Sequence, residues 1–138
     1  MRTVVSGYVT FVTGGRAFAG RLGEVREVVR ATGIEALTVA RAPITGLLVL
    51  RSSPVPVVDL RSEPYAGDTG DVLVLQTPDG VLGLAVDKVV SVLGPEGLTA
   101  TEQTAAGLPS YVLEVRRDAA GEPVLVVSLP ALAGLVPA

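Results

Sequence analysis

The sequence predicts an all-β barrel or sandwich built from many short strands. Valine and leucine dominate a composition that is 49% hydrophobic and only 4% aromatic, and branched β-carbons pack well on a pleated surface. The apolar residues fall in short runs separated by turn signals such as Gly14-Gly15 and Pro78-Asp79-Gly80. Short strands divided by turns are typical of closed or two-layered β architectures.

The first predicted element is a hairpin near the N-terminus. Residues 4–13 have the apolar character of a strand, and Gly14-Gly15 favours a tight turn. Residues 16–20 begin the return strand.

A short amphipathic helix is predicted after this hairpin. Its apolar residues fall at positions i, i+3, i+6 and i+7, namely Leu22, Val25, Val28 and Val29. This spacing places them on one helical face, with charged residues on the remainder. Gly33 ends the helix or lies just past its end, and residues 31–45 are predicted to be irregular.

A second hairpin is predicted over residues 47–58, where two Val/Leu runs flank a polar turn. Arg51 ends its first strand, and its second strand leads into Asp59 and Arg61. Residues 62–70 are predicted to form a loop because they contain Pro and Gly.

The second half of the chain continues the alternation of short strands and turns. Strands are predicted over residues 71–76, 81–86, 89–93, 111–117 and 124–128. Residues 94–110, rich in Gly, Pro, Thr and Ala, are predicted to be mainly a loop. Residues 130–135 are predicted to form a terminal helical turn.

The sequence also contains a weak internal repeat. Residues 54–60 (PVPVVDL) match residues 123–129 (PVLVVSL) at an offset of 69, and residues 18–28 echo residues 82–92 at an offset of 64. Two copies of one small barrel would give this pattern. Chance similarity between Val-rich strands is the alternative explanation.

The composition excludes several classes of function. The chain has 138 residues, a typical length for one domain, and a net charge of −3. Its ten Arg and one Lys are scattered, whereas nucleic-acid binding needs clustered basic residues. The absence of Cys and His removes disulfides, thiolate metal ligands and the commonest general base. We therefore predict a protein with no catalytic activity, no cofactor and no nucleic-acid partner.

Neither a signal peptide nor a membrane span is evident. No apolar segment of signal-peptide length follows Arg2 before Gly14. No apolar run approaches the ~20 residues that cross a bilayer, and Asp87 and Lys88 interrupt the longest candidate, residues 81–93. We therefore expect a cytoplasmic protein without direct membrane insertion.

Two motifs carry a resemblance to a known family. Residues 46–61 read GLLVLRSSPVPVVDLR, and residues 83–93 read GLAVDKVVSVL. Their content, order and separation resemble the CheW-like family, the coupling adaptors of bacterial chemotaxis. The resemblance covers most of the chain.

The resemblance implies two SH3-like five-stranded β-barrels with short helices within a single domain, residues 1–138. The first subdomain would comprise residues of about 12–80 plus the C-terminal residues. The second would comprise residues of about 81–128 plus the N-terminal strand.

The resemblance also implies a function and its residues. The chain would bind the regulatory domain of a CheA-type histidine kinase and the cytoplasmic tip of a chemoreceptor. Arg51 and Gly46 match family positions near the kinase contact. Val25 and Glu27, on the predicted helix, match positions implicated in receptor contact.

Each of these residues also has a structural interpretation. Arg51 could form an internal pair with an acid such as Asp59, and Gly46 could be a simple turn glycine. Val25 could pack in the core, and Glu27 could be a solvated surface residue. For the motif aspartates Asp59 and Asp87 we favour structural hydrogen bonding.

The chain departs from the family pattern around its second hairpin. Val49 and Ser52 replace the usual Asn and Gly, and Pro54 removes a strand donor. The segment before Gly46 is also shorter than usual. These departures leave two further possibilities open, namely a diverged interaction module with other partners and the excised regulatory domain of a kinase.

Overall fold

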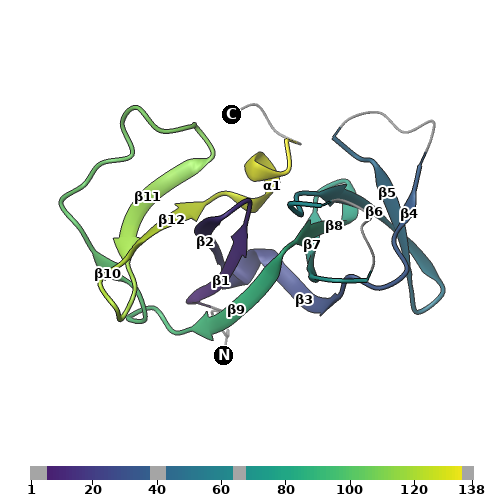
Figure 1. Cartoon of the computed structure of the whole chain (residues 1–138), viewed down its shortest axis with the longest axis horizontal. Helices are drawn as coiled ribbons and strands as arrows, with labels where there is room; N and C mark the ends of the chain where they lie inside the picture. Colours follow the sequence, from purple (N-terminus) through teal and green to yellow (C-terminus); the bar gives the residue numbers. More distant parts are fainter. Residues whose placement is uncertain (1–5, 38–42, 64–67, 135–138) are drawn as a thin grey trace.

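The computed structural model describes residues 6–37, 43–63 and 68–134, and this part of the chain is mostly β (Figure 1). The strands form two six-stranded sheets. The terminal sheet has the order β10 (Thr99–Ala100), β11 (Val112–Arg117), β12 (Pro123–Val127), β2 (Arg16–Arg21), β1 (Tyr8–Thr13), β9 (Lys88–Leu93). The inserted sheet has the order β3 (Val25–Arg30), β7 (Asp71–Thr77), β8 (Gly80–Val86), β6 (Ser53–Asp59), β5 (Gly46–Leu50), β4 (Glu35–Ala36). The predicted all-β class is confirmed.

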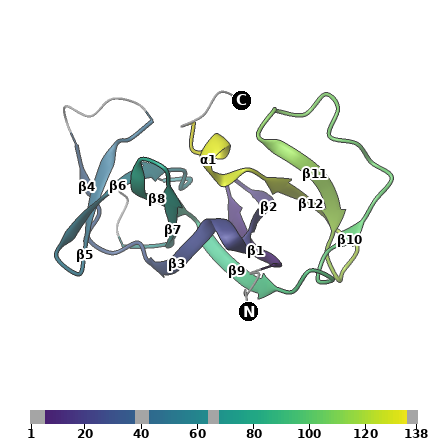
Figure 2. The same ribbon diagram turned by 180° about the vertical axis from the view of Figure 1, so that it is seen from behind.

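The chain passes from one sheet to the other at two short crossings. The first is the 3₁₀ turn η1 (Leu22–Glu24), between β2 and β3, and the second is Asp87, between β8 and β9. The inserted sheet is therefore one continuous segment between two parts of the terminal sheet (Figures 1 and 2). Strand pairing thus divides the chain differently from the approximate subdomain boundaries, because β2 pairs with β1 and β8 pairs with β7.

The two sheets confirm the internal repeat. Read as β4-β5-β6-β8-β7-β3 and β10-β11-β12-β2-β1-β9, their strand orders correspond one to one. The parallel pairing also agrees in register: Val57 lies opposite Gly83, and Val126 lies opposite Ala19. These pairs are related by the offsets of 69 and 64 residues found in the sequence.

The predicted helix after the first hairpin is wrong. Residues 22–24 form a single 3₁₀ turn, and Val25–Arg30 form the edge strand β3, paired with β7. The more buried and more exposed residues of β3 alternate, so Val25 and Val29 share a strand face as well as the helical face inferred from their spacing. β-branched valines and the partner strand β7 decide in favour of the strand.

The second hairpin forms as predicted, but Arg51 lies in its turn rather than at a strand end. Leu50 pairs with Ser53, so the two turn residues are Arg51 and Ser52. Both have left-handed backbone conformations, with φ of 48° and 69°. Two-residue hairpin turns favour this conformation because its twist matches that of the flanking strands.

Replacing Ser52 with glycine is expected to stabilise the protein. A left-handed φ costs an L-residue about 1–2 kcal/mol, and the greater freedom of glycine in the unfolded chain offsets part of this gain. We expect a net increase of about 0.5–1 kcal/mol in the free energy of unfolding, measured by urea denaturation. Ser53→Gly, in the adjoining extended strand, is the control and should destabilise. A loss of stability in Ser52→Gly would contradict the prediction.

The other predicted elements are largely confirmed. Residues 94–110 are mainly a loop but also include β10, and β4 lies in the segment predicted to be irregular. The terminal helical turn is α1 (Leu129–Leu132), capped by the Ser128 hydroxyl. The predicted limits at Val4 and Leu135 lie outside the described residues.

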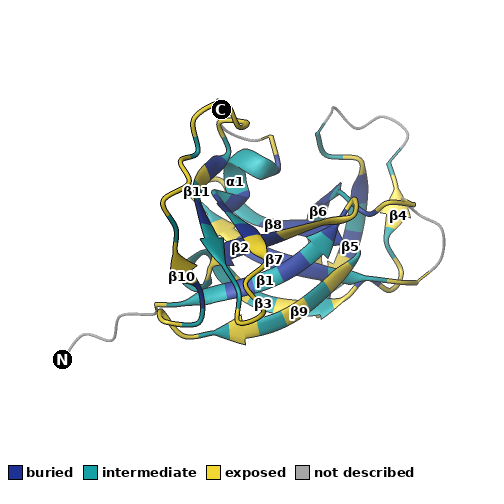
Figure 3. Ribbon diagram, turned by 60° about the vertical axis from the view of Figure 1, so that its left-hand side comes forward, coloured by how far each residue is buried: buried dark blue, intermediate teal, exposed yellow. Residues whose placement is uncertain are grey.

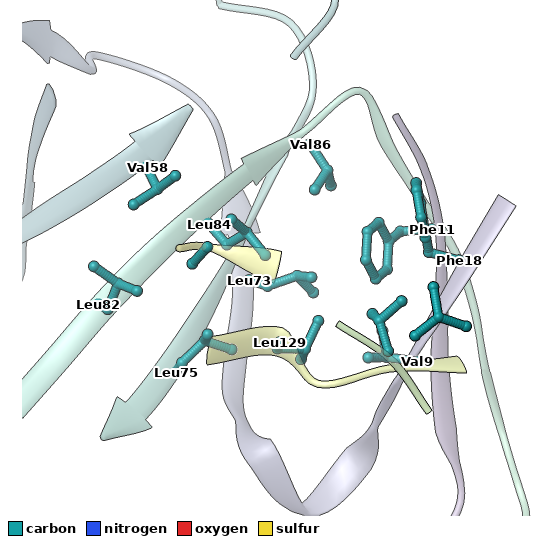
Figure 4. Packing of buried hydrophobic residues seen from close by; sticks show 13 residues of the cluster. Val9, Phe11, Phe18, Val58, Leu73, Leu75, Leu82, Leu84, Val86 and Leu129 are labelled. Carbon is teal, nitrogen blue, oxygen red and sulfur yellow. The ribbon is translucent and has the colours of Figure 1, made fainter. Parts of the chain in front are cut away.

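The largest apolar cluster joins the two sheets. Val9, Phe11 and Phe18 of the terminal sheet lie beside Leu73 and Leu84 of the inserted sheet (Figure 4). Leu129 of α1 is buried in the same cluster. Buried residues concentrate along this interface, while the outward faces of β9 and β3 are more exposed (Figure 3). The sheets therefore share one core.

Candidate functional site

The turn residue Arg51 forms an ion pair with Glu27 of β3. The Arg51 Nη1 atom donates to Glu27 Oε1 at 3.1 Å, and Nη2 donates to Oε2. The Arg51 side chain is 65% exposed, against 27% for that of Glu27. This hydrogen bonding lowers the pKa of Glu27 and raises that of Arg51, so both groups stay charged. The pair fixes a guanidinium that remains open to solvent.

The ion pair stands on the rim of a concave surface of about 430 Å³. Residues from β3, the second hairpin, β7 and β8 line it: Arg26, Glu27, Leu50, Arg51, Ser53, Pro54, Val55, Val74 and Val81. Val55 and Val74 are buried, whereas Arg26 and Pro54 are exposed. We call these nine residues the Arg51 surface. Its apolar floor and charged rim suit recognition of another protein.

The structure brings together two of the four predicted site residues. Arg51 and Glu27 are in direct contact on the Arg51 surface, whereas Gly46 and Val25 do not line it. Gly46 is buried at the start of β5, opposite Val57. Val25 is half-buried and packs against the large core cluster. The sequence gave no sign that Glu27 is the partner of Arg51, because their strands are not neighbours along the chain.

The motif aspartate Asp59 is paired with Arg61 rather than with Arg51. Arg61 Nη2 donates to Asp59 Oδ2 at 2.8 Å and Arg61 Nε to Oδ1 at 3.0 Å, with side chains 3% and 1% exposed. Arg61 Nη1 also donates to the carbonyl of Thr69 at 2.9 Å. This buried pair ties the end of β6 to the segment before β7, which is a structural role for Asp59.

The second motif aspartate, Asp87, holds three segments together at the second crossing. Its Oδ1 accepts from the Ser62 amide at 2.7 Å, and its Oδ2 accepts from the Ser62 hydroxyl at 2.5 Å and the Gly14 amide at 3.1 Å. The amide of Asp87 donates to Thr13 Oγ1 at 3.4 Å, and that hydroxyl donates to the Leu60 carbonyl at 2.5 Å. The role is structural, as the sequence suggested.

Stability at acid pH is expected to depend on Asp87. Burial raises the pKa of Asp87, but the hydrogen bonds from Ser62 and Gly14 and the charge of Arg61 outweigh it, so the pKa falls below its ordinary value of 3.8. A lowered folded-state pKa contributes stability above the unfolded value, and this contribution is lost as pH falls through the folded value. Asp87→Asn should therefore show a shallower loss of stability below about pH 4 in urea denaturation. An unchanged pH slope would contradict this.

Among the described residues, no three side chains of the Asp, Glu, His or Cys type gather into a possible metal site. The described helices also include none with the length and hydropathy of a membrane-spanning segment. The charged groups of the Arg51 surface form a closed ion pair, which is the chemistry of binding rather than of bond cleavage.

Comparison with known proteins agrees with this picture. A family model described as the CheW-like domain matches residues 7–136. The fold is similar to that of the crystal structure of scaffolding protein TtCheW from Thermoanaerobacter tengcongensis, with a TM-score of 0.70 and 17% sequence identity over 93% of this chain and 87% of that chain. No curated protein sequence matches the chain. Because the family model spans nearly all of its length, the chain belongs to the CheW-like family of non-catalytic scaffold domains.

Proposed function

We propose that this chain is a coupling adaptor in a bacterial chemosensory pathway. It would act in the cytoplasm and join the cytoplasmic tip of a chemoreceptor to the regulatory domain of a CheA-type histidine kinase. Membership of the CheW-like family supports the general role. The observation that carries the specific proposal is the exposed, oriented guanidinium of Arg51 beside an apolar concave surface.

Arg51 has the properties of a binding hot spot for the kinase. Arginine is enriched at such positions because its planar fork makes several directed hydrogen bonds. The bond to Glu27 holds the side chain in place before binding, so less conformational entropy is lost when a partner docks. The apolar floor beneath it offers area for burial.

The receptor contact would lie next to the kinase contact. Glu27, one of the proposed receptor-facing residues, is the partner of Arg51. Val25 lies two residues earlier on the same strand and supports β3 by packing on the core. A receptor helix would contact this edge of the inserted sheet through apolar side chains, a helix-in-groove mode of binding.

Arg51→Ala is expected to weaken binding to the kinase's regulatory domain without destabilising the protein. Both Arg51 and the hairpin turn are exposed, and truncation of a hot-spot residue costs about 2 kcal/mol or more, some 30-fold in affinity. Isothermal titration calorimetry measures the affinity, and a thermal melt measures the stability.

Arg30→Ala is the matched control, because Arg30 is an exposed arginine of the same strand, β3, outside the Arg51 surface. Its affinity should stay near that of the unmodified protein. Equal weakening by both variants, or a parallel loss of thermal stability in Arg51→Ala, would refute the placement of the kinase contact.

A diverged module with other partners is the second candidate. The residues that depart from the family pattern, Val49, Ser52 and Pro54, are all exposed on the hairpin that carries Arg51. Val49 is 63% exposed, so it changes the chemistry of the surface itself. If the folded chain binds neither the cognate kinase domain nor the receptor tip, this second function is favoured.

A further inference from the structure

The two crossings between the sheets occupy equivalent positions in the internal repeat. The offset of 64 residues that relates β2 to β8 and β1 to β7 places Gly23, in η1, in correspondence with Asp87. These crossings are the covalent links by which the inserted sheet enters and leaves the terminal sheet. Any change in the angle between the sheets must therefore deform one crossing or both.

The Asp87 crossing is closed by polar contacts from both sheets. Asp87 accepts from Gly14 in the β1–β2 turn and from Ser62 beyond β6. Two residues later, the amide of Val89 in β9 donates to Asp71 Oδ2 of β7 at 2.8 Å. Four backbone segments are thus fastened around one residue.

The Gly23 crossing lacks every equivalent of these contacts. Gly23 has no carboxylate, and the position equivalent to Gly14 is Pro78, which has no amide hydrogen. The positions equivalent to Ser62 and Asp71 are Ala131 and Gly7, which have no side-chain hydrogen-bonding group. Four independent substitutions within the repeat therefore leave this crossing without the network.

The packing at the Gly23 crossing is also more open. A hollow of about 370 Å³ lies there, lined by Ser6, Gly7, Tyr8, Arg21, Gly23, Glu24, Pro95 and Glu114. One long contact crosses it, from the Leu129 amide to Glu24 Oε1 at 3.5 Å. The space and the weak contact both allow movement of the backbone at this crossing.

We propose that the Asp87 network is a one-sided lock that sets the angle between the two sheets, and that the Gly23 crossing accommodates changes in this angle. The inserted sheet carries the Arg51 surface. The lock would therefore fix how that surface is oriented relative to the terminal sheet. This inference does not depend on which partner binds Arg51.

The distance between the two sheets tests the proposal. The chain contains no cysteine, so two introduced cysteines can be spin-labelled without further changes. Glu35 in β4 and Ala100 in β10 are exposed and lie at the far edges of the two sheets (Figure 1). Pulsed electron–electron resonance gives the distribution of distances between the two labels.

Asp87→Ala should broaden this distribution and shift its mean. Asp118→Ala is the matched control, because Asp118 also accepts hydrogen bonds from backbone amides, those of Ala120 and Glu122, but within one turn of the terminal sheet. The control should leave the distribution unchanged.

An unchanged distribution in folded Asp87→Ala, or equal broadening in Asp118→Ala, would overturn the proposal. If Asp87→Ala does not fold, Ser62→Ala carries the test, because it removes only the hydroxyl contact to Asp87. Broadening in Ser62→Ala supports the lock, and an unchanged distribution in that variant contradicts it. Circular dichroism establishes that each variant is folded.

Discussion

Arg61→Ala is expected to lower the free energy of unfolding by about 3–5 kcal/mol, because it leaves the Asp59 carboxylate buried without its cation. Asp59 is almost completely inaccessible to solvent and receives two side-chain hydrogen bonds from Arg61. The variant also loses the contact with the Thr69 carbonyl. Urea denaturation monitored by far-ultraviolet circular dichroism measures the loss.

Two comparisons separate this effect from the general cost of removing an arginine. Arg51→Ala removes an exposed arginine from the same hairpin region and should change stability by no more than about 1 kcal/mol. The double variant Asp59→Leu/Arg61→Met should recover much of the loss, because apolar residues of similar size often replace buried ion pairs without cost. A small effect of Arg61→Ala would mean that water reaches Asp59.

Phe11→Ala is expected to destabilise the protein by a similar amount, about 3–5 kcal/mol. Phe11 is fully buried, and its ring stacks on that of Phe18 with 5.5 Å between the centroids. The ring lies in the cluster shared by the two sheets (Figure 4). Its removal therefore opens a cavity at their interface rather than within one sheet.

Differential scanning calorimetry tests whether the sheets unfold together. Because the cavity lies in a shared core, we expect one transition at a lower temperature rather than two separate transitions. Val49→Ala, which truncates an exposed side chain, should change stability by no more than about 0.5 kcal/mol. Two resolved transitions in Phe11→Ala would show that each sheet folds independently.

Local patterns predicted most of the strands and turns because their signals are local. Gly14-Gly15 and Pro78-Asp79 mark hairpins through backbone preferences that need no distant partner. The helix over residues 22–29 failed because its spacing also satisfies part of a strand pattern. The pairing of β3 with β7, more than 40 residues away, resolves that ambiguity, and no local signal encodes it.

The candidate site was predictable in part for the same reason. Arg51 stands out as a charged residue within an apolar hairpin, and family resemblance adds weight to it. Its bond to Glu27 depends on how β3 and the second hairpin are placed around β7 and β8. The repeat, in contrast, encoded long-range information, since its two offsets match the parallel pairings of β2 with β12 and β8 with β6.

The insertion of one sheet within the other imposes an order on folding during synthesis. Every strand of the inserted sheet has been made once residue 86 leaves the ribosome, whereas β2 must wait for β12. From Arg21 to Val127 is 106 residues, or about 5–20 s of translation. During this time the β1–β2 hairpin has open edges and apolar side chains with no partner strand. The nascent chain is therefore most exposed to aggregation and chaperone binding at its first-made end.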